Sequence, residues 1–302
     1  MLRRRNVVTL LAAVAASALP LAVAAQDKPK VVATFSILAD LAKNVGGDRV
    51  EVTALVGPDG DAHVYSPTPA DGRRLAEAKL VVANGLKLEG WVGRLIKSSG
   101  TKAPVAEAAK GVQPLKTAEH GHDHGHTDVD PHAWQNVANV KRYVANIRDG
   151  LIAADPAGKA AYEANAAAYL EKLDALDKDV KAAIDAIPRD RRKIITSHDA
   201  FGYFQKAYGV TFIAPQGVST EAEASAKDVA RIIQQIRREK IRAVFLENVS
   251  DPRLLERIAK ESGARIGGKI YSDALSGPDG PAGTYIDMMR HNIRALSAAL
   301  SS

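Results

Sequence analysis

The feature that most constrains the fold is a long stretch of chain that contains no helix breaker. Residues 159–187 include neither glycine nor proline and are rich in Ala, Lys, Glu, Leu and Asp. Pro156 suits the first turn of a helix, and Pro188 ends one. At about 1.5 Å per residue, such a helix is a rod of roughly 45 Å, the width of a whole domain. We predict one long helix over 156–188, and not a helical hairpin, because no turn signal interrupts it.

The same alternation of segments occurs on both sides of this helix. Short runs rich in Val and Ile, bounded by turn residues, predict strands, and apolar residues at three- and four-residue spacing predict helices. The predicted strands are 31–34, 50–56 and 80–83, then 193–196, 210–214 and 241–246; the predicted helices are 37–45 and 69–79, then 200–208, 225–239, 252–262 and 284–300. Such alternation is typical of a mainly parallel sheet flanked by helices. We expect an α/β fold with two lobes, 26–155 and 189–302, joined by the long helix.

The first 25 residues have the features of an export signal. Arg3, Arg4 and Arg5 precede an apolar run over 7–23, and small residues at 22, 24 and 25 form an A-x-A-like cleavage site. This pattern predicts a cleaved signal peptide over 1–25, and the run is short for a retained membrane anchor. The pattern leaves open whether the general secretory or the twin-arginine route is used. The expected location is the periplasm.

The chain contains no cysteine, which excludes disulfides, thiolate metal sites, thiol nucleophiles and a lipidated cysteine anchor. We therefore expect a mature protein that is soluble. Removing the predicted signal takes away three arginines and no acids, so the formal net charge falls from +6 to +3. No concentrated basic stripe indicates a nucleic-acid partner. A monomer is expected.

Eight histidines are the main candidates for chemistry. Four of them lie in the glycine-containing segment 120–126, which has no apolar residue and is expected to be a loop within 118–128. His63, His132 and His198 lie in loops next to predicted strands or helices, where open α/β sheets bind ligands. His291 lies in the predicted helix 284–300 between polar neighbours, which favours a solvated surface position.

Three neutral imidazoles and one carboxylate form a suitable ligand set for zinc. No local motif such as H-x-x-x-H is present, so the fold has to assemble the set. Spacing alone leaves the carboxylate open among Asp61, Asp130, Asp199, Glu247 and Asp273.

A set of short segments forms a further pattern over both halves and the joining helix. These are 31–40 (VVATFSILAD), 61–67 (DAHVYSP), 84–85 (NG), 89–91 (EGW), 130–134 (DPHAW), 162–165 (YEAN), 169–173 (YLEKL), 196–203 (TSHDAFGY), 217–220 (GVST) and 271–276 (YSDALS). With this pattern the chain resembles the zinc- and manganese-binding solute-binding proteins of bacterial ABC transporters, the cluster A-I group. The resemblance extends from about Lys30 to the C-terminus and is interrupted mainly by the histidine-rich segment.

The resemblance implies a metal held between the two lobes. Its ligands would be His63 and His132 from the first lobe, with His198 and Asp273 from the second. Manganese-preferring relatives look similar but place a glutamate where this chain has His198, so a third imidazole here favours Zn²⁺. The resemblance further implies a periplasmic protein that captures Zn²⁺ and delivers it to an importer made of a membrane permease and a cytoplasmic ATPase. Four protein ligands close the shell, so no enzymatic activity is expected.

Several alternatives remain open at this point. His120, His122, His124 and His126 form an accessory metal-binding loop that could collect zinc, sense its abundance or help a periplasmic zinc donor protein dock. The same fold could serve manganese or iron. A zinc hydrolase would instead leave Asp273 unbound and use Glu247 as a base, with water in the fourth coordination position.

Overall fold

The computed structural model describes residues 27–116 and 129–301. The predicted signal peptide 1–25 and the histidine-rich loop 118–128 therefore lie outside the described residues. Within the described ranges, no helix combines the length and apolar character that crossing a membrane requires.

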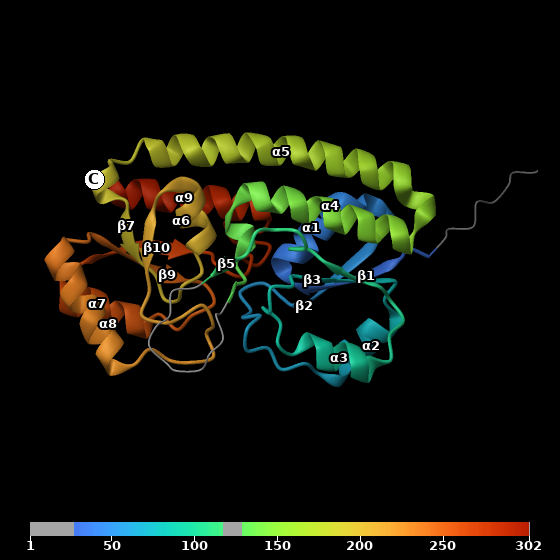
Figure 1. Ribbon diagram of the computed structural model, residues 1–302, viewed down its shortest axis with the longest axis horizontal. Coiled ribbons are helices and arrows are strands. Elements are labelled where there is room, and N and C mark those ends of the chain that lie inside the picture. The colour runs from blue at the N-terminus through green and yellow to red at the C-terminus, as the bar shows by residue number, and fades with distance from the viewer. Residues whose placement is uncertain (1–26, 117–128, 302) are drawn as a thin grey trace, which may run out of the picture.

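Two four-stranded parallel sheets form the centres of two lobes (Figure 1). The first has the order β2 (Glu51–Val56), β1 (Lys30–Phe35), β3 (Leu80–Ala83), β4 (Val105–Glu107). The second has the order β10 (Arg265–Ile270), β9 (Ala243–Glu247), β7 (Lys193–Ile195), β8 (Thr211–Ile213). A two-stranded antiparallel ribbon pairs β5 (Leu115–Lys116) with β6 (Val129–Asp130). The predicted two-lobe α/β fold class is confirmed.

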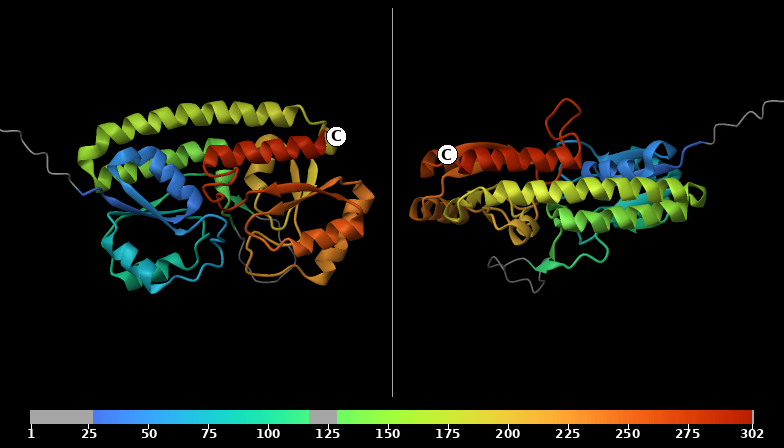
Figure 2. Two further views of the ribbon diagram at one scale, coloured as in Figure 1. Left: turned by 180° about the vertical axis from the view of Figure 1, so that it is seen from behind. Right: turned by 90° about the horizontal axis from the view of Figure 1, so that it is seen from above.

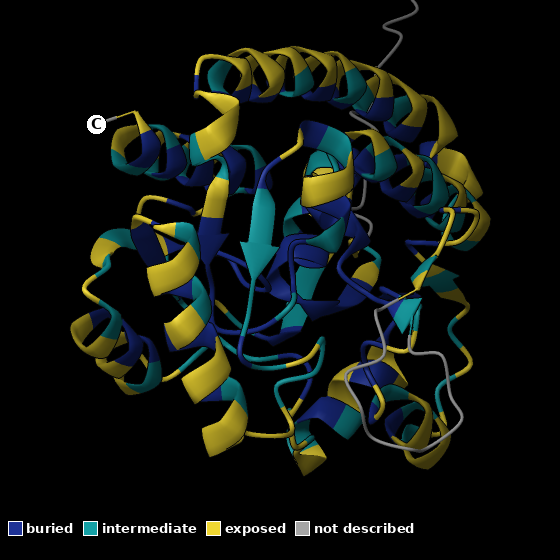
Figure 3. Ribbon diagram, turned by 60° about the vertical axis from the view of Figure 1, so that its left-hand side comes forward, coloured by how far each residue is buried: buried dark blue, intermediate teal, exposed yellow. Residues whose placement is uncertain are grey.

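Helices cover both faces of the sheets, and their buried sides face inward (Figure 3). One layer contains α1 (Ser36–Gly46), α4 (Val137–Ala154), α5 (Lys159–Asp185) and α9 (Tyr285–Leu300), which contact one another (Figure 2). The remaining helices are α2 (Pro69–Glu77) and α3 (Val92–Ser99) in the first lobe, with α6 (Gly202–Tyr208), α7 (Ala226–Glu239) and α8 (Arg253–Ser262) in the second. Short 3₁₀ turns η1 to η4 occupy Gly47–Arg49, Ala133–Gln135, Pro156–Gly158 and Arg189–Arg191.

Helix α5 is the predicted long helix, and it extends along both lobes (Figure 1). Its 27 residues correspond to about 40 Å of helix. Residues at three- and four-residue spacing form its buried face: Tyr162, Ala166, Tyr169, Leu173, Leu176, Val180 and Ile184. Leu170 is only half-buried, because Tyr169 occupies the inward position of that turn.

A continuous apolar core extends through this helical layer from the first lobe into the second. It contains residues of β1 and α1, of α4 and α5, and of α6 and α9. A separate cluster under α7 and α8 is confined to the second lobe and includes Ile195, Ile232 and Leu255. The two lobes are therefore joined by a shared core on the α5 side.

Strand β10 is absent from the sequence-based prediction because its centre is Gly267-Gly268. The pairing with β9 shifts in register there, and Gly268 has φ +126°. A Cβ on Gly267 would lie 2.6 Å from the ring of Phe245. Glycine here permits a bulge and close packing, whereas pattern reasoning treats it as the end of a strand.

Candidate metal centre

Four loops bring His63, His132, His198 and Asp273 together between the lobes. His63 follows β2, His132 lies between β6 and η2, His198 follows β7, and Asp273 follows β10. All four side chains are buried, and one ligand atom from each lies within 4.8 Å of the others. The carboxyl ends of parallel strands in two sheets thus face one point, which is where α/β sheets bind ligands.

The separations between ligand atoms suit a small metal ion. His63 Nε2 lies 3.2 Å from His132 Nε2. Asp273 Oδ2 lies 3.0 Å from His198 Nε2 and 3.4 Å from His63 Nε2, and its Oδ1 lies 3.6 Å from His132 Nε2. A tetrahedral ion with bonds of about 2.0 Å requires ligand atoms about 3.3 Å apart. These four distances lie on both sides of that value, and all four ligand atoms lie within 4.8 Å of one another, so the set is close to the spacing that such an ion requires.

A carboxylate orients the ring of His132. Asp130 Oδ1 lies 2.8 Å from His132 Nδ1 and accepts the His132 backbone N–H at 2.9 Å. When Nδ1–H donates to this oxygen, Nε2 keeps its lone pair free for a metal. Asp130 is itself buried at the end of β6.

Glu247 has the corresponding role behind His198. Its Oε2 lies 2.7 Å from His198 Nδ1, and its Oε1 accepts the backbone N–H groups of Ser197 at 2.6 Å and of His198 at 3.0 Å. Both of its oxygens are thus directed at the far side of the imidazole and the adjoining backbone. This is the position of a supporting group, and it does not match the base that the hydrolase alternative requires.

Hydrogen bonds hold the loop that carries His63. Asp61 Oδ1 accepts the His63 backbone N–H at 2.8 Å, and Trp91 Nε1 donates to the carbonyl of Ala62 at 2.8 Å. His63 is 8% exposed, whereas the other three ligand candidates are fully buried. Solvent therefore approaches the cluster on the His63 side.

The loop that carries Asp273 is fixed to the first lobe. Trp134 Nε1 and Gln135 Nε2 both donate to the carbonyl of Ser272, at 2.9 and 2.7 Å. Ser36 Oγ accepts the backbone N–H of Leu275 at 3.0 Å. Asp273 belongs to the second lobe by sequence, yet the residues on either side of it are bonded to the first.

Charge compensation dominates the protonation of the cluster. Burial lowers the pKa of His132, but the carboxylates of Asp273 and Asp130 outweigh burial and raise this pKa to about 9. Burial likewise lowers the pKa of His198, but the carboxylates of Glu247 and Asp273 outweigh burial and raise this pKa well above its usual value. At Asp273 burial raises the pKa, yet His198 and His132 outweigh it, so the pKa lies well below the usual value. A cation that binds the ring nitrogens has to displace protons from His132 and His198, so binding should release protons.

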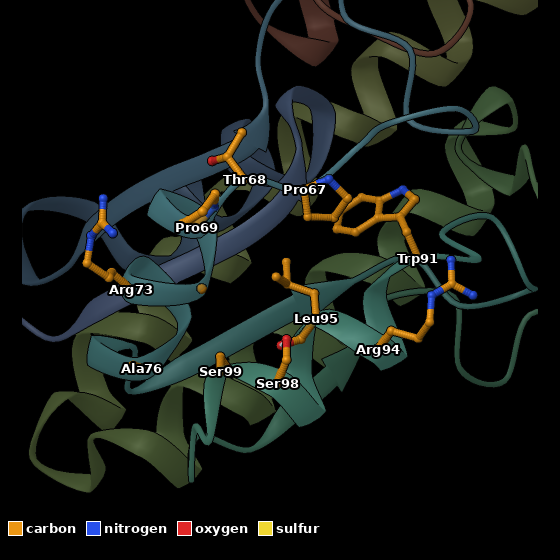
Figure 4. Close-up of a pocket in the computed structure, with 11 residues that line it drawn as sticks. Pro67, Thr68, Pro69, Arg73, Ala76, Trp91, Arg94, Leu95, Ser98 and Ser99 are labelled. Carbon is orange, nitrogen blue, oxygen red and sulfur yellow. The ribbon is translucent and has the colours of Figure 1, made fainter.

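A surface pocket of about 660 Å³ lies outside this cluster, between α2 and α3 (Figure 4). Its lining includes Pro67, Pro69, Trp91 and Leu95. None of the four ligand candidates lines it. Its connection to the cluster is Trp91, which supports the loop of His63 from behind through the bond to Ala62.

Comparison with known families places these observations in context. Residues 31–299 match the family described as "ZnuA: Zinc-uptake complex component A periplasmic". The chain belongs to this family. It is therefore a substrate-binding protein of a metal ABC importer that acts outside the cytoplasm, and the family is not enzymatic.

Individual relatives are named for different metals. The chain is 34% identical over 272 residues to the manganese-binding lipoprotein MntA of Halalkalibacterium halodurans, covering 90% of this chain and 88% of MntA. It is 35% identical over 270 residues to the iron-binding protein YfeA of Yersinia pestis, covering 89% and 86%. The structure resembles that of the periplasmic zinc binding protein TroA of Treponema pallidum, with a TM-score of 0.84, 32% identity, and coverage of 90% of this chain and 99% of TroA. The two sequence relatives support the manganese or iron alternative more directly than zinc.

The supporting carboxylates are what sequence reasoning missed. Asp130 and Glu247 were candidates for the fourth ligand, and Glu247 also for the base of the hydrolase alternative. Spacing could not tell a ligand from a residue behind a ligand. One available signal was the position of Asp130 two residues before His132, which allows one carboxylate to bond both its backbone and its ring. His291 lies outside the cluster, with its Nε2 2.9 Å from the carbonyl of Lys269.

Proposed function

We propose that this protein captures a divalent metal with His63, His132, His198 and Asp273, and that zinc is its preferred cargo. The single observation that carries the proposal is the buried set of three imidazole nitrogens and one carboxylate. Imidazole nitrogen suits zinc, whereas manganese prefers oxygen ligands. The acids behind His132 and His198 strengthen these rings as metal ligands and fix their orientation.

The donor set supports holding and releasing a metal rather than turning over a substrate. Four protein ligands complete a tetrahedral shell and leave no position for an activated water. Delivery would then proceed to a membrane permease with a cytoplasmic ATPase, after export directed by the signal peptide over 1–25. Two lobes that each supply ligands allow such a partner to distinguish loaded from empty protein.

Manganese or iron is the second candidate cargo. The names of MntA and YfeA favour it. The orientation of the Asp273 side chain is a second reason to consider manganese or iron, since its Oδ1 and Oδ2 both face imidazole nitrogens. Two oxygens from one carboxylate would raise the coordination number, which suits a larger and harder ion such as Mn²⁺.

Competition between metals distinguishes the two candidates. Metal analysis of the protein isolated from its own periplasm should find zinc. In a titration, Zn²⁺ should displace Mn²⁺ even when the Mn²⁺ concentration is about 100 times the Zn²⁺ concentration. His198→Glu should reduce the preference for Zn²⁺ over Mn²⁺ because it exchanges a nitrogen ligand for an oxygen ligand. His291→Ala, a histidine outside the cluster, is the matched control and should leave the preference unchanged. Manganese or iron in the isolated protein, retained against equimolar zinc, would establish the second candidate instead.

The histidine-rich loop is proposed as an accessory collector of zinc. The imidazoles of His120, His122, His124 and His126 are suitable zinc ligands, and fixing four side chains around a metal costs conformational entropy. Deleting 118–127 should lower the number of zinc ions bound per chain while sparing the tightest site. Loss of the tightest site in this deletion would show that the loop belongs to it.

A further inference from the structure

One side chain of the first lobe bonds both to a candidate ligand and to the opposite lobe. Asp61 Oδ1 accepts the backbone N–H of His63 at 2.8 Å, and its Oδ2 accepts the hydroxyl of Thr220 at 2.6 Å. Asp61 and Thr220 are 159 residues apart and both are partly buried. A carboxylate that accepts two such bonds is held in one orientation, so the positions of His63 and Thr220 depend on each other.

The loop of Thr220 is in turn bonded to both neighbours of His198. Gln216 donates its backbone N–H to the carbonyl of Ser197 at 3.3 Å, and Asp199 donates its own to the carbonyl of Gly217 at 3.1 Å. The bond between Asp61 and Thr220 therefore joins the backbone at one ligand candidate of the first lobe to the backbone at one of the second.

A second contact lies beside the first. Asp59 Oδ1 accepts Asn248 Nδ2 at 3.0 Å, and the Asp59 backbone N–H donates to the carbonyl of Leu275 at 2.9 Å. Asn248 follows Glu247, which supports His198, and Leu275 lies two residues after Asp273. Asp59 has φ +54°, a conformation that a residue other than glycine adopts at a cost unless its surroundings hold it. The exposed side-chain pair Asp59–Asn248 is expected to be the weaker of the two contacts.

We infer that Asp61 and Thr220 form a latch that closes the loops over the bound metal and sets how long the metal stays. The inference rests on the proposed function, because it takes His63 and His198 as ligands. Asp61 is a positioning residue that acts through His63. Opening of the site requires the bond to Thr220 to break before the two ligands separate. The latch therefore slows release, and the inference takes association to occur from conformations in which this bond is broken.

Thr220→Val tests the latch, because valine has nearly the same shape and cannot donate to Asp61. The full chain loaded with one equivalent of Zn²⁺ is mixed rapidly with excess chelator, and association is measured separately. A hydrogen bond to a charged acceptor is strong enough for release to become about 10-fold faster, with association changed by less than about twofold. Thr220→Ser keeps the hydroxyl and should restore slow release.

Ser219→Ala is the matched control in the same loop, since Ser219 Oγ accepts only the local N–H of Glu221 among the contacts found in the described residues. It should release zinc at the wild-type rate. If Thr220→Val also does so while His63→Ala binds zinc poorly, the latch is wrong and the proposed function stands. If His63→Ala binds zinc as tightly as the wild type, the proposed function is wrong and the latch falls with it.

Discussion

The two lobes are joined in two different ways on opposite sides of the metal cluster. On the α5 side, one apolar core continues from β1 and α1 through α4 and α5 to α9. On the cleft side, the connections are individual polar bonds between loops, such as those of Asp61 with Thr220 and of Asp59 with Asn248. Close-packed apolar contacts resist rearrangement, whereas a few polar bonds can exchange with water. We therefore expect the α5 side to keep the two sheets aligned, and the loops on the cleft side to rearrange when the metal enters.

The largest expected effect is loss of metal binding when a ligand on the cleft side is removed. His198→Ala should weaken zinc binding by about 1,000-fold or more, because it removes one ligand and leaves the buried Glu247 without its partner. Calorimetric or chelator-competition titration measures the change. The unfolding midpoint of the metal-free protein serves as the control for folding. If His198→Ala bound zinc as tightly as the wild type, His198 would not be a ligand of the metal.

A core substitution on the α5 side should act on stability instead. Leu176 is fully buried in α5, and Leu176→Ala should lower the free energy of unfolding by about 2–5 kcal/mol. Denaturant titration of the metal-free protein should still show one transition, because both lobes share this core. The exposed Lys172 in the same helix provides the control, and Lys172→Ala should change stability by less than about 0.5 kcal/mol. Two separate transitions in Leu176→Ala would mean that the lobes are less firmly joined than the shared core implies.

The acids behind the imidazoles should have an intermediate effect. Glu247→Gln keeps the shape of the side chain but removes its charge, so zinc affinity should fall about 10- to 100-fold. The exposed acid Glu256 in α8 offers a matched substitution, and Glu256→Gln should leave affinity unchanged. A loss as large as that of His198→Ala would indicate that Glu247 is itself a ligand, whereas no loss would mean that the ring of His198 needs no support.

The smallest expected effect concerns Asp40, a partly buried acid on the α5 side. Burial raises the pKa of Asp40 to about 6, although Asp40 accepts the backbone N–H of Tyr285 at 2.9 Å and so ties α1 to α9. The folded state then binds a proton more tightly than the unfolded chain. The contribution of Asp40 to stability should therefore improve as the pH falls from about 7 to 4, by at most about 2–3 kcal/mol.

Asp40→Asn should remove this part of the pH dependence. Unfolding of the metal-free wild type and variant at pH 5 and pH 7.5 measures it, and the difference between the two proteins cancels groups that titrate in both. A variant that loses more stability at pH 7.5 than at pH 5 would show that the charged carboxylate favours the folded state.

Local patterns were sufficient for much of the fold. The apolar, β-branched runs at β1, β2 and β3 predict these strands to within one or two residues, because a buried strand requires such side chains. The absence of glycine and proline predicts α5 for a different reason, because these two residue types are the ones that interrupt helices. Strand β10 escaped prediction, since its two glycines are accommodated only by the ring of Phe245 and a register shift against β9.

The donor types of the metal cluster were likewise present in the sequence. His63, His132 and His198 were candidates from their positions beside predicted elements, and their chemistry already indicated a metal. Only the family resemblance selected Asp273 from five acids, because spacing along the chain carries no information about which carboxylates converge. The structure places Asp130 and Glu247 behind the rings and Asp61 beside His63.

The sequence by itself determined many of the helices and strands, the two α/β halves with one long helix between them, and which side chains can bind a metal. These properties depend on local conformational preference and on the chemistry of single residues. Only the tertiary structure decided which acids face the cluster, which acids support its imidazoles, and which bonds cross between the lobes. Those relations join residues as far apart in the chain as Ser36 and Leu275, 239 positions, and they exist only once packing has brought the strand ends of both sheets to one place.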